Sequence, residues 1–201
     1  MAGGKETPRQ KMIGMMYLVL TALLALNVSK EILDAFVVVN NGLVQTDKNF
    51  TNNNNLLYSS LEAQLANDPV RARKAVDDSK KLKKWANDIH QYIDDIKTEL
   101  IVAEDQIAKD VAAKKLDSLS TVQNKDKYDN CTRIMCGDGT ANAKGKATDL
   151  KNKIIEFKKN MMSILPESVK KTTNLGLKTE DPPKKGTAVE TWEMEKFYHL
   201  P

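Results

Sequence analysis

Residues 12–29, which read MIGMMYLVLTALLALNVS, carry no charged side chain. A helix of this length extends about 27 Å, close to the roughly 30 Å of a bilayer's hydrocarbon core. Before this stretch cations outnumber anions, with Lys5, Arg9 and Lys11 against Glu6. Just after it anions outnumber cations, with Glu31 and Asp34 against Lys30. Because segments rich in Lys and Arg stay in the cytoplasm, the sequence predicts a single transmembrane helix at 12–29. Residues 1–11 would be cytoplasmic and residues 30–201 would lie across the membrane.

A cleaved signal peptide is the main alternative, because it would have the same basic start. However, Ala25-Leu26-Asn27 makes a poor cleavage site, and the apolar pattern continues past the charges as far as Val39. A helix that continues without interruption is a poor substrate for signal cleavage, so we expect an uncleaved anchor.

The start of this helix is also marked in the sequence. Thr7-Pro8-Arg9-Gln10 fits a capping box, with Thr7 as N-cap and Pro8 in the first helical position. Arg9 and Lys11 would therefore be helical and lie at the cytoplasmic interface. The alternative is that basic residues in such a position only fix the orientation of the helix in the membrane, with their side chains extending to the lipid headgroups.

Beyond the anchor, apolar residues recur at helical spacing. We expect the first helix to run to about Thr46 and to be weakened or broken by the four asparagines at 52–55. Asp68 and Pro69 predict the start of a second helix that reaches about residue 113. A further helix is expected from Leu150 to Ile164, between loops at 118–145 and 167–188.

Each predicted helix has one apolar face, so the helices must pack together. The second helix shows this best, with apolar residues at spacings of three and four: Leu82, Trp85, Ile89, Tyr92, Ile96 and Leu100. We therefore predict an all-α fold, a helical bundle after the transmembrane helix, with a coiled-coil dimer as the competitor. Trp192 and Phe197 form an apolar cluster that needs covering, which suggests that the chain is a fragment of a longer protein.

Composition and motifs argue against several functions. The net charge of +4 is small for a nucleic-acid binder, and two cysteines and two histidines are too few for a multi-zinc architecture. The segment GDGTANAKGK at 137–146 lacks the spacing and the Ser or Thr of a phosphate loop. His90 and His199 have no partner at metal-binding spacing. We expect no enzyme activity, no cofactor and no metal site.

Cys131 and Cys136 are the chain's two cysteines. They are five residues apart in a segment predicted to be a loop, and the predicted topology places them in an oxidising compartment. A disulfide between them is favoured over two free thiols.

The stretch GGKETPRQKMIGMMYLVLTALLALNVSKEILDAFVVVNNGL, at 3–43, resembles the start of the GldM family, called PorM in relatives that do not glide. Members are inner-membrane proteins of the type IX secretion system and gliding-motility machinery. They continue into further periplasmic domains that reach an outer-membrane ring. The resemblance implies that residues 30–201 are the first periplasmic domain, truncated at its C-terminal end.

The resemblance also implies a mechanism. GldM pairs with GldL in a motor driven by the proton-motive force, in which two GldM helices sit inside a ring of five GldL subunits. The expected function is thus a force-transmitting motor subunit and homodimer that powers protein secretion and gliding. The alternative is a passive membrane-anchored periplasmic scaffold that docks components of the secretion apparatus.

Two groups of residues follow as candidates for the contacts of such a subunit. Residues 12–29 contain no ionisable side chain, so a titrating carboxylate would have to lie on GldL. Arg9 is the best counter-charge for it, Tyr17 offers a hydroxyl at greater depth, and Lys11 is a weaker candidate. For the dimer contact we expect Phe36, Val39 and Leu43.

Overall fold

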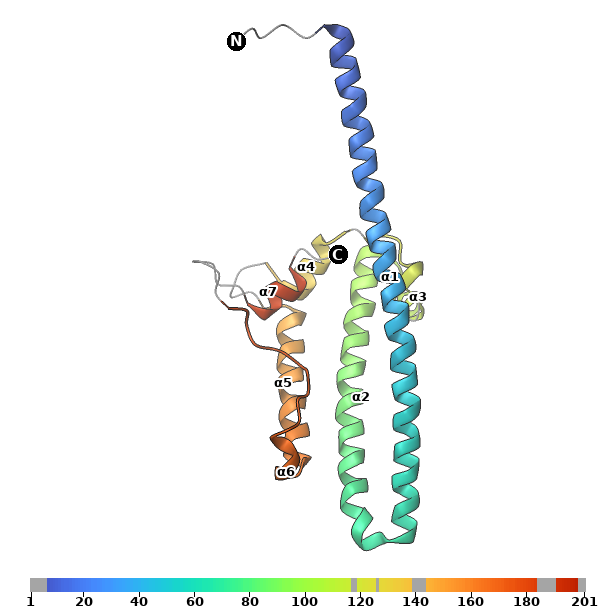
Figure 1. Cartoon of the computed structure of the whole chain (residues 1–201), viewed down its shortest axis with the longest axis vertical. Coiled ribbons are helices and arrows are strands. Elements are labelled where there is room, and N and C mark those ends of the chain that lie inside the picture. The colour runs from blue at the N-terminus through green and yellow to red at the C-terminus, as the bar shows by residue number, and fades with distance from the viewer. Residues whose placement is uncertain (1–6, 117–118, 126, 139–143, 184–190, 199–201) are drawn as a thin grey trace. The chain divides into compact units, whose positions relative to one another are not determined.

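The structure is a computed structural model of the whole chain. It describes residues 7–116, 119–125, 127–138, 144–183 and 191–198, without the side chains of residues 24–31. Within these ranges every regular element is a helix, which confirms the all-α prediction (Figure 1). The chain divides into two compact units, Met1–Leu43 and Val44–Pro201.

Helix α1 (Pro8–Asn67) begins as the sequence predicts. The backbone N–H of Thr7 donates to Oε1 of Gln10 over 2.9 Å, and the N–H of Gln10 donates to Oγ1 of Thr7 over 3.4 Å. These are the two reciprocal bonds of a capping box. The predicted break at 52–55 is wrong, because α1 passes through the asparagines without interruption. Asparagine weakens a helix by only a few tenths of a kcal/mol per residue, and neither Pro nor Gly accompanies it here.

In the first unit, all the side chains that the structure describes from Thr7 to Leu23 are exposed. Part of the predicted transmembrane segment, residues 24–29, lies outside the described side chains. Among the residues that the structure does describe, no helix is both long enough and apolar enough to cross a membrane.

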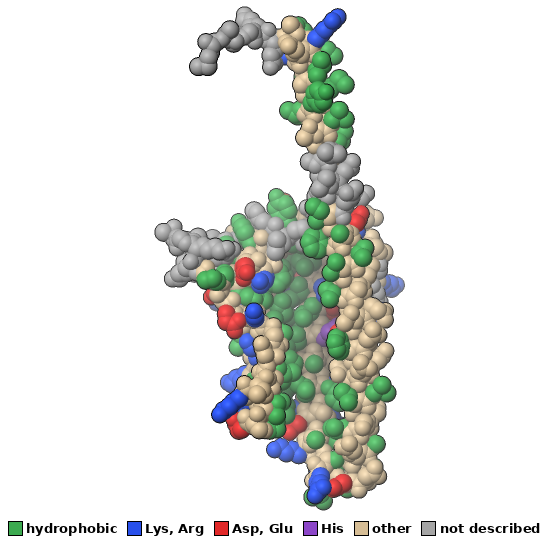
Figure 2. All heavy atoms as spheres, in the orientation of Figure 1, with side chains coloured by type: hydrophobic (Ala, Val, Ile, Leu, Met, Phe, Trp, Pro, Cys, Tyr) green, Lys and Arg blue, Asp and Glu red, His purple; other side chains and the backbone are tan. Residues whose placement is uncertain are grey.

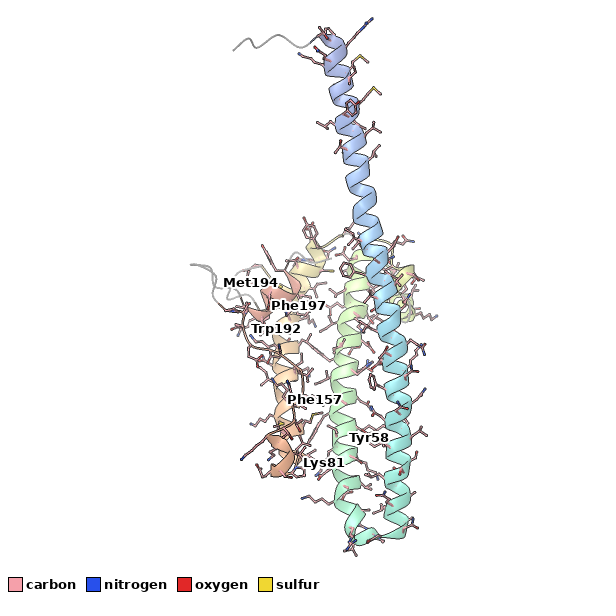
Figure 3. The ribbon with its side chains drawn as sticks, viewed as in Figure 1. Tyr58, Lys81, Phe157, Trp192, Met194 and Phe197 are labelled. Atoms are coloured by element: carbon pink, nitrogen blue, oxygen red, sulfur yellow. The ribbon has the colours of Figure 1, made fainter. Side chains whose placement is uncertain are left out.

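In the second unit, α2 (Pro69–Asp105) runs antiparallel to the last part of α1. The predicted start is confirmed, since Oδ1 of Asp68 accepts a bond from the backbone N–H of Arg71. Two side-chain contacts join the pair. Nε2 of His90 lies 3.9 Å from Oδ2 of Asp47, and Nζ of Lys83 lies 4.9 Å from the ring centre of Tyr58, which is labelled in Figure 3.

The second helix ends earlier than predicted. Gln106 adopts a left-handed conformation with φ 53°, and a separate helix α3 (Lys109–Lys115) follows. The loop predicted at 118–145 contains a 3₁₀ turn (Leu119–Thr121) and helix α4 (Asp129–Cys136). The carboxylate of Asp105 holds this region against the end of α2, because it accepts bonds from the backbone N–H groups of Gln123 and Asn124.

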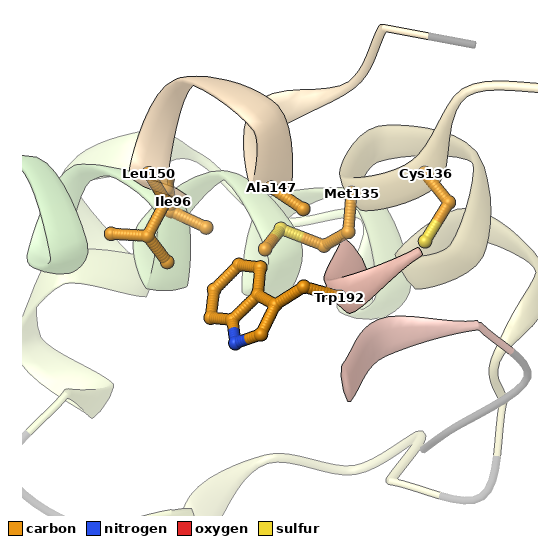
Figure 4. Close-up of a cluster of buried hydrophobic side chains, with 6 residues drawn as sticks. All are labelled: Ile96, Met135, Cys136, Ala147, Leu150 and Trp192. Carbon is orange, nitrogen blue, oxygen red and sulfur yellow. The ribbon is translucent and has the colours of Figure 1, made fainter. Parts of the chain in front are cut away.

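The third long helix, α5 (Lys146–Ile164), ends where predicted but begins before the predicted Leu150. The single turn α6 (Glu167–Lys170) follows it. The core lies where α2, α4, α5 and α7 (Trp192–Phe197) meet. Its buried side chains are shown in Figure 4: Ile96, Met135, Cys136, Ala147, Leu150 and Trp192. Trp192, which the sequence predicted to need covering, is therefore covered by residues of this chain, and only 7% of it is exposed.

Away from this core, α2 and α5 separate around a shallow cavity of about 200 Å³. Trp85 and Ile89 of α2 and Phe157 of α5 line it, and all three are only half-buried. Figure 2 shows hydrophobic side chains gathered along the hollow beside α5. The apolar stripe of α2 therefore changes along its length, from a closed core at Ile96 to an open groove at Trp85.

Candidate interaction surfaces

The three residues expected to meet GldL all lie on the first part of α1. Arg9, Lys11 and Tyr17 are exposed, and the carbonyl oxygen of Tyr17 accepts a bond from the hydroxyl of Thr21 over 2.6 Å. At about 100° per residue, Tyr17 is displaced by roughly 80° from Arg9 around the axis, and Lys11 by roughly 200°. Arg9 and Tyr17 can therefore face one partner at two depths, whereas Lys11 points elsewhere.

The three residues expected at the dimer contact lie further along α1 and are also exposed, from 58% for Val39 to 66% for Phe36. Further along α1 the structure leaves Leu56 exposed, and it leaves equally uncovered two apolar side chains at a seven-residue spacing from Leu43, namely Phe50 and Leu57. Neither residue is among those predicted for the dimer contact. The spacing of Phe50 and Leu57 could have identified them in the sequence, because they lie seven and fourteen residues after Leu43, as in a seven-residue apolar repeat.

The predicted disulfide does not form. Cys131 and Cys136 are free thiols on α4, where the sequence predicted a loop. Residues five apart on a helix are separated by about 7.5 Å along the axis alone, which is beyond the reach of a disulfide. Burial raises the pKa of the Cys131 thiol to about 11, and the nearby Glu104 carboxylate acts in the same direction.

Cys136 is buried and its Sγ lies 3.4 Å from the carbonyl oxygen of Glu193, so it links α4 to α7. Burial raises the pKa of this thiol as well, and the charge of Glu193 adds to the effect. Both thiols are therefore protonated, packed groups rather than reactive ones.

Two motifs set aside in the sequence have structural explanations. His90 is exposed and its Nδ1 lies 3.2 Å from Oδ2 of Asp94, which fits a polar surface residue. Of the phosphate-loop-like segment, residues 139–143 lie outside the described residues, but Gly145 is described. A Cβ at Gly145 would lie 2.1 Å from the carbonyl oxygen of Met135. Glycine is therefore needed there for the close approach of α5 to α4.

A charged cluster ties the segment before α7, and α7 itself, to α5. Lys151 of α5 contacts Asp181 at 2.7 Å and Glu193 at 3.4 Å. Burial alone would lower the pKa of Lys151, but the hydrogen bond from Lys151 to Asp181 and the two negative charges raise it above its ordinary value. Asp181 also accepts a bond from the backbone N–H of Trp192, so this cluster fixes the start of α7.

Within the described residues these features define a class of protein, an all-helical fold whose long helix α1 exposes many apolar side chains. Among the described residues, no group of three or more His, Cys, Asp or Glu side chains could hold a metal ion. The family model of the GldM N-terminal domain matches residues 31–201. The chain belongs to the GldM family, and so to the machinery of type IX secretion and gliding motility. No curated protein matches the chain closely enough to count as a relative.

Proposed function

We propose that this chain is a force-transmitting subunit of an inner-membrane motor that is driven by the proton-motive force and powers type IX secretion and gliding. One observation carries the proposal: α1 is a single uninterrupted helix from Pro8 to Asn67. The apolar segment and the start of the family domain are therefore parts of one element. A continuous helix has no loop in which motion applied at one end would be lost.

In this proposal residues 12–29 span the membrane, residues 1–11 are cytoplasmic and residues 30–201 form the periplasmic helical domain. The support is the sequence pattern itself, an uncharged stretch long enough for a bilayer with cations on one side. Two copies of the chain would sit inside a ring of five GldL subunits. Domains beyond residue 201 would carry the motion to the outer-membrane ring.

The coupling step would depend on charge. A carboxylate within the bilayer is costly when ionised unless it meets a counter-charge. Since residues 12–29 offer no ionisable group, we assign the titrating carboxylate to GldL and its counter-charge to Arg9. The guanidinium is permanently charged and can bond a carboxylate through two N–H groups. Tyr17 would offer a hydroxyl deeper in the membrane, and Lys11 would contribute mainly to topology.

The Arg9→Lys variant tests this assignment, because it keeps the positive charge but removes the two-bond geometry. We expect secretion and gliding speed to fall sharply while the complex with GldL still assembles. Lys11→Arg is the matched control, since it also conserves charge and should leave both activities unchanged. A passive scaffold would tolerate both variants. Full activity in the double variant Arg9→Lys with Tyr17→Phe would overturn the coupling role.

A further inference from the structure

Helix α2 carries its charges in two blocks. Residues 69–84 contain seven lysines and arginines against two aspartates, whereas residues 85–105 contain one lysine against six acidic residues. Because the whole chain has a net charge of only +4, the chain outside residues 69–84 is slightly acidic. The positive charge of the protein is therefore concentrated on the first half of α2, beside the turn at 67–69 that joins it to α1.

Three cations of this block form a basic strip on one face of α2: Arg73, Lys80 and Lys84. At about 100° per residue they fall within roughly 40° of one another around the axis. The strip lies roughly 80° from Lys83, which faces α1, and roughly 120° from Trp85, which faces α5. All three side chains are exposed, and none forms an ion pair with another residue that the structure describes. The strip can therefore meet a negatively charged partner.

The open groove between α2 and α5 adjoins the basic strip. Asp88, which lines the groove, follows Lys84 by one turn and lies roughly 40° from it around the axis. Figure 3 shows Lys81 of the same block on the side of α2 toward α5, below Phe157 of the groove. The groove's volume of about 200 Å³ is below the roughly 300–1,000 Å³ of small-molecule sites, so it fits apolar side chains of a larger partner better.

We infer that the basic strip and the groove together bind an acidic, amphipathic helix of another protein. The groove takes apolar side chains of that helix, and the strip takes its carboxylates. The spacing of the strip indicates a helical partner, because its cations are four and seven residues apart, about 6 and 10.5 Å along the axis. A helix laid beside α2 repeats these distances when Asp or Glu occurs at the same intervals.

Two other anionic partners fit this surface less well. A uniform polyanion would meet Asp77 within the strip and would leave the apolar groove unused. In the proposed topology lipid headgroups are too distant, since the 24 residues of α1 from Val44 to Asn67 extend about 36 Å before the turn beside the strip. The inference rests on the proposed function for this location, and it adds a class of protein partner for the helical domain.

Binding of a synthetic peptide to the full chain in nanodiscs of zwitterionic lipid tests the inference. The probe is a helix-forming peptide with glutamates at intervals of four and seven residues and leucines on the adjacent face. It should bind, and Lys80→Glu with Lys84→Glu should raise its dissociation constant about tenfold or more. Lys114→Glu with Lys127→Glu is the matched control, because it changes the net charge equally at exposed lysines beyond the end of α2. This control should leave the dissociation constant within about twofold of the unsubstituted chain.

The groove needs a variant of its own. Asn160→Arg leaves the apolar floor in place but puts a long side chain across the groove, so it should weaken binding while the circular dichroism spectrum stays helical. Because this variant adds a positive charge, a surface that holds the probe by charge alone would bind it more tightly, and that result would overturn the inference.

Two further results would overturn it: no binding of the probe to the unsubstituted chain, or an equal loss in the Lys114 and Lys127 control. Neither measurement involves GldL. A chain that binds the probe as expected but does not associate with GldL would contradict the proposed function alone.

Discussion

Nζ of Lys115 lies 2.7 Å from Oδ2 of Asp105, and only 1% of the Asp105 side chain is exposed. This ion pair joins the end of α2 to the end of α3, and the same carboxylate accepts the backbone N–H groups of Gln123 and Asn124. Burial by itself would raise the pKa of Asp105. The hydrogen bond from Lys115 and those from the two backbone N–H groups outweigh burial, so the pKa lies below its ordinary value.

Asp105→Asn should therefore destabilise the domain by about 2 kcal/mol, the order of a hydrogen bond to a charged group. Because the pKa of Asp105 is lowered by folding, its contribution is fully present above the unfolded pKa, near pH 4, and is lost as the pH falls further. Urea unfolding of the unsubstituted chain and of Asp105→Asn, each at pH 7 and at pH 3, would measure this loss as a change in the free energy of unfolding. If the difference in unfolding free energy between the two proteins is as large at pH 3 as at pH 7, the role of the ionised carboxylate is contradicted.

Trp192 should be the side chain whose loss most weakens the core. It is buried, its ring centre lies 5.6 Å from that of Phe197, and its Nε1–H donates to the carbonyl oxygen of Lys178. Trp192→Ala should cost about 3–5 kcal/mol, as for other buried aromatic residues. Val70→Ala, at a side chain that is 92% exposed, should cost less than about 0.5 kcal/mol. Equal unfolding midpoints for the two variants would show that α7 does not contribute to the core.

Local signals in the sequence were enough to predict the starts of α1 and α2. Thr7, Asp68 and Pro69 act within one turn, so their effect does not depend on the rest of the fold. The end of α2 could not be predicted in this way. It depends on the bonds that Asp105 forms with residues ten to nineteen positions later, which no periodicity reveals.

The contrast between local signals and distant contacts also explains why the surroundings of the cysteines and the exposed residues of α1 could not be predicted. Polar composition at 118–145 suggested a loop, but burial of Met135 and Cys136 against Trp192 favours a helix there. On α1, the apolar residues alone could not separate a contact with α2 from a contact with another chain. Only the structure shows that Phe50 and Leu57 are left uncovered.

Cys131 should react slowly with alkylating reagents in the folded protein. Its pKa of about 11, against an ordinary 9.0, lowers the thiolate fraction near neutral pH about a hundredfold. Mass spectrometry after iodoacetamide treatment at pH 8 should find both thiols unmodified in the native protein and both modified in urea. Rapid native labelling of Cys131, or a mass two units lower from a disulfide, would contradict the environment described for α4.

Phe36→Asp combined with Val39→Asp should weaken the pairing of two chains without unfolding the helical domain. Both side chains are exposed in the single chain, so the substitutions remove no described core contact. Sedimentation of the full chain in detergent should show a shift from dimer toward monomer, while the circular dichroism spectrum stays helical. Unchanged sedimentation would exclude these residues from the dimer contact.

The central claim is that this chain serves as a paired motor subunit within a ring of GldL. The most direct test is the mass of the complex that co-purifies with the chain after mild detergent extraction, measured by native mass spectrometry. The account predicts two copies of this chain with five copies of GldL. A single chain that carries no GldL, extracted under conditions that leave its helical domain folded, would contradict the account.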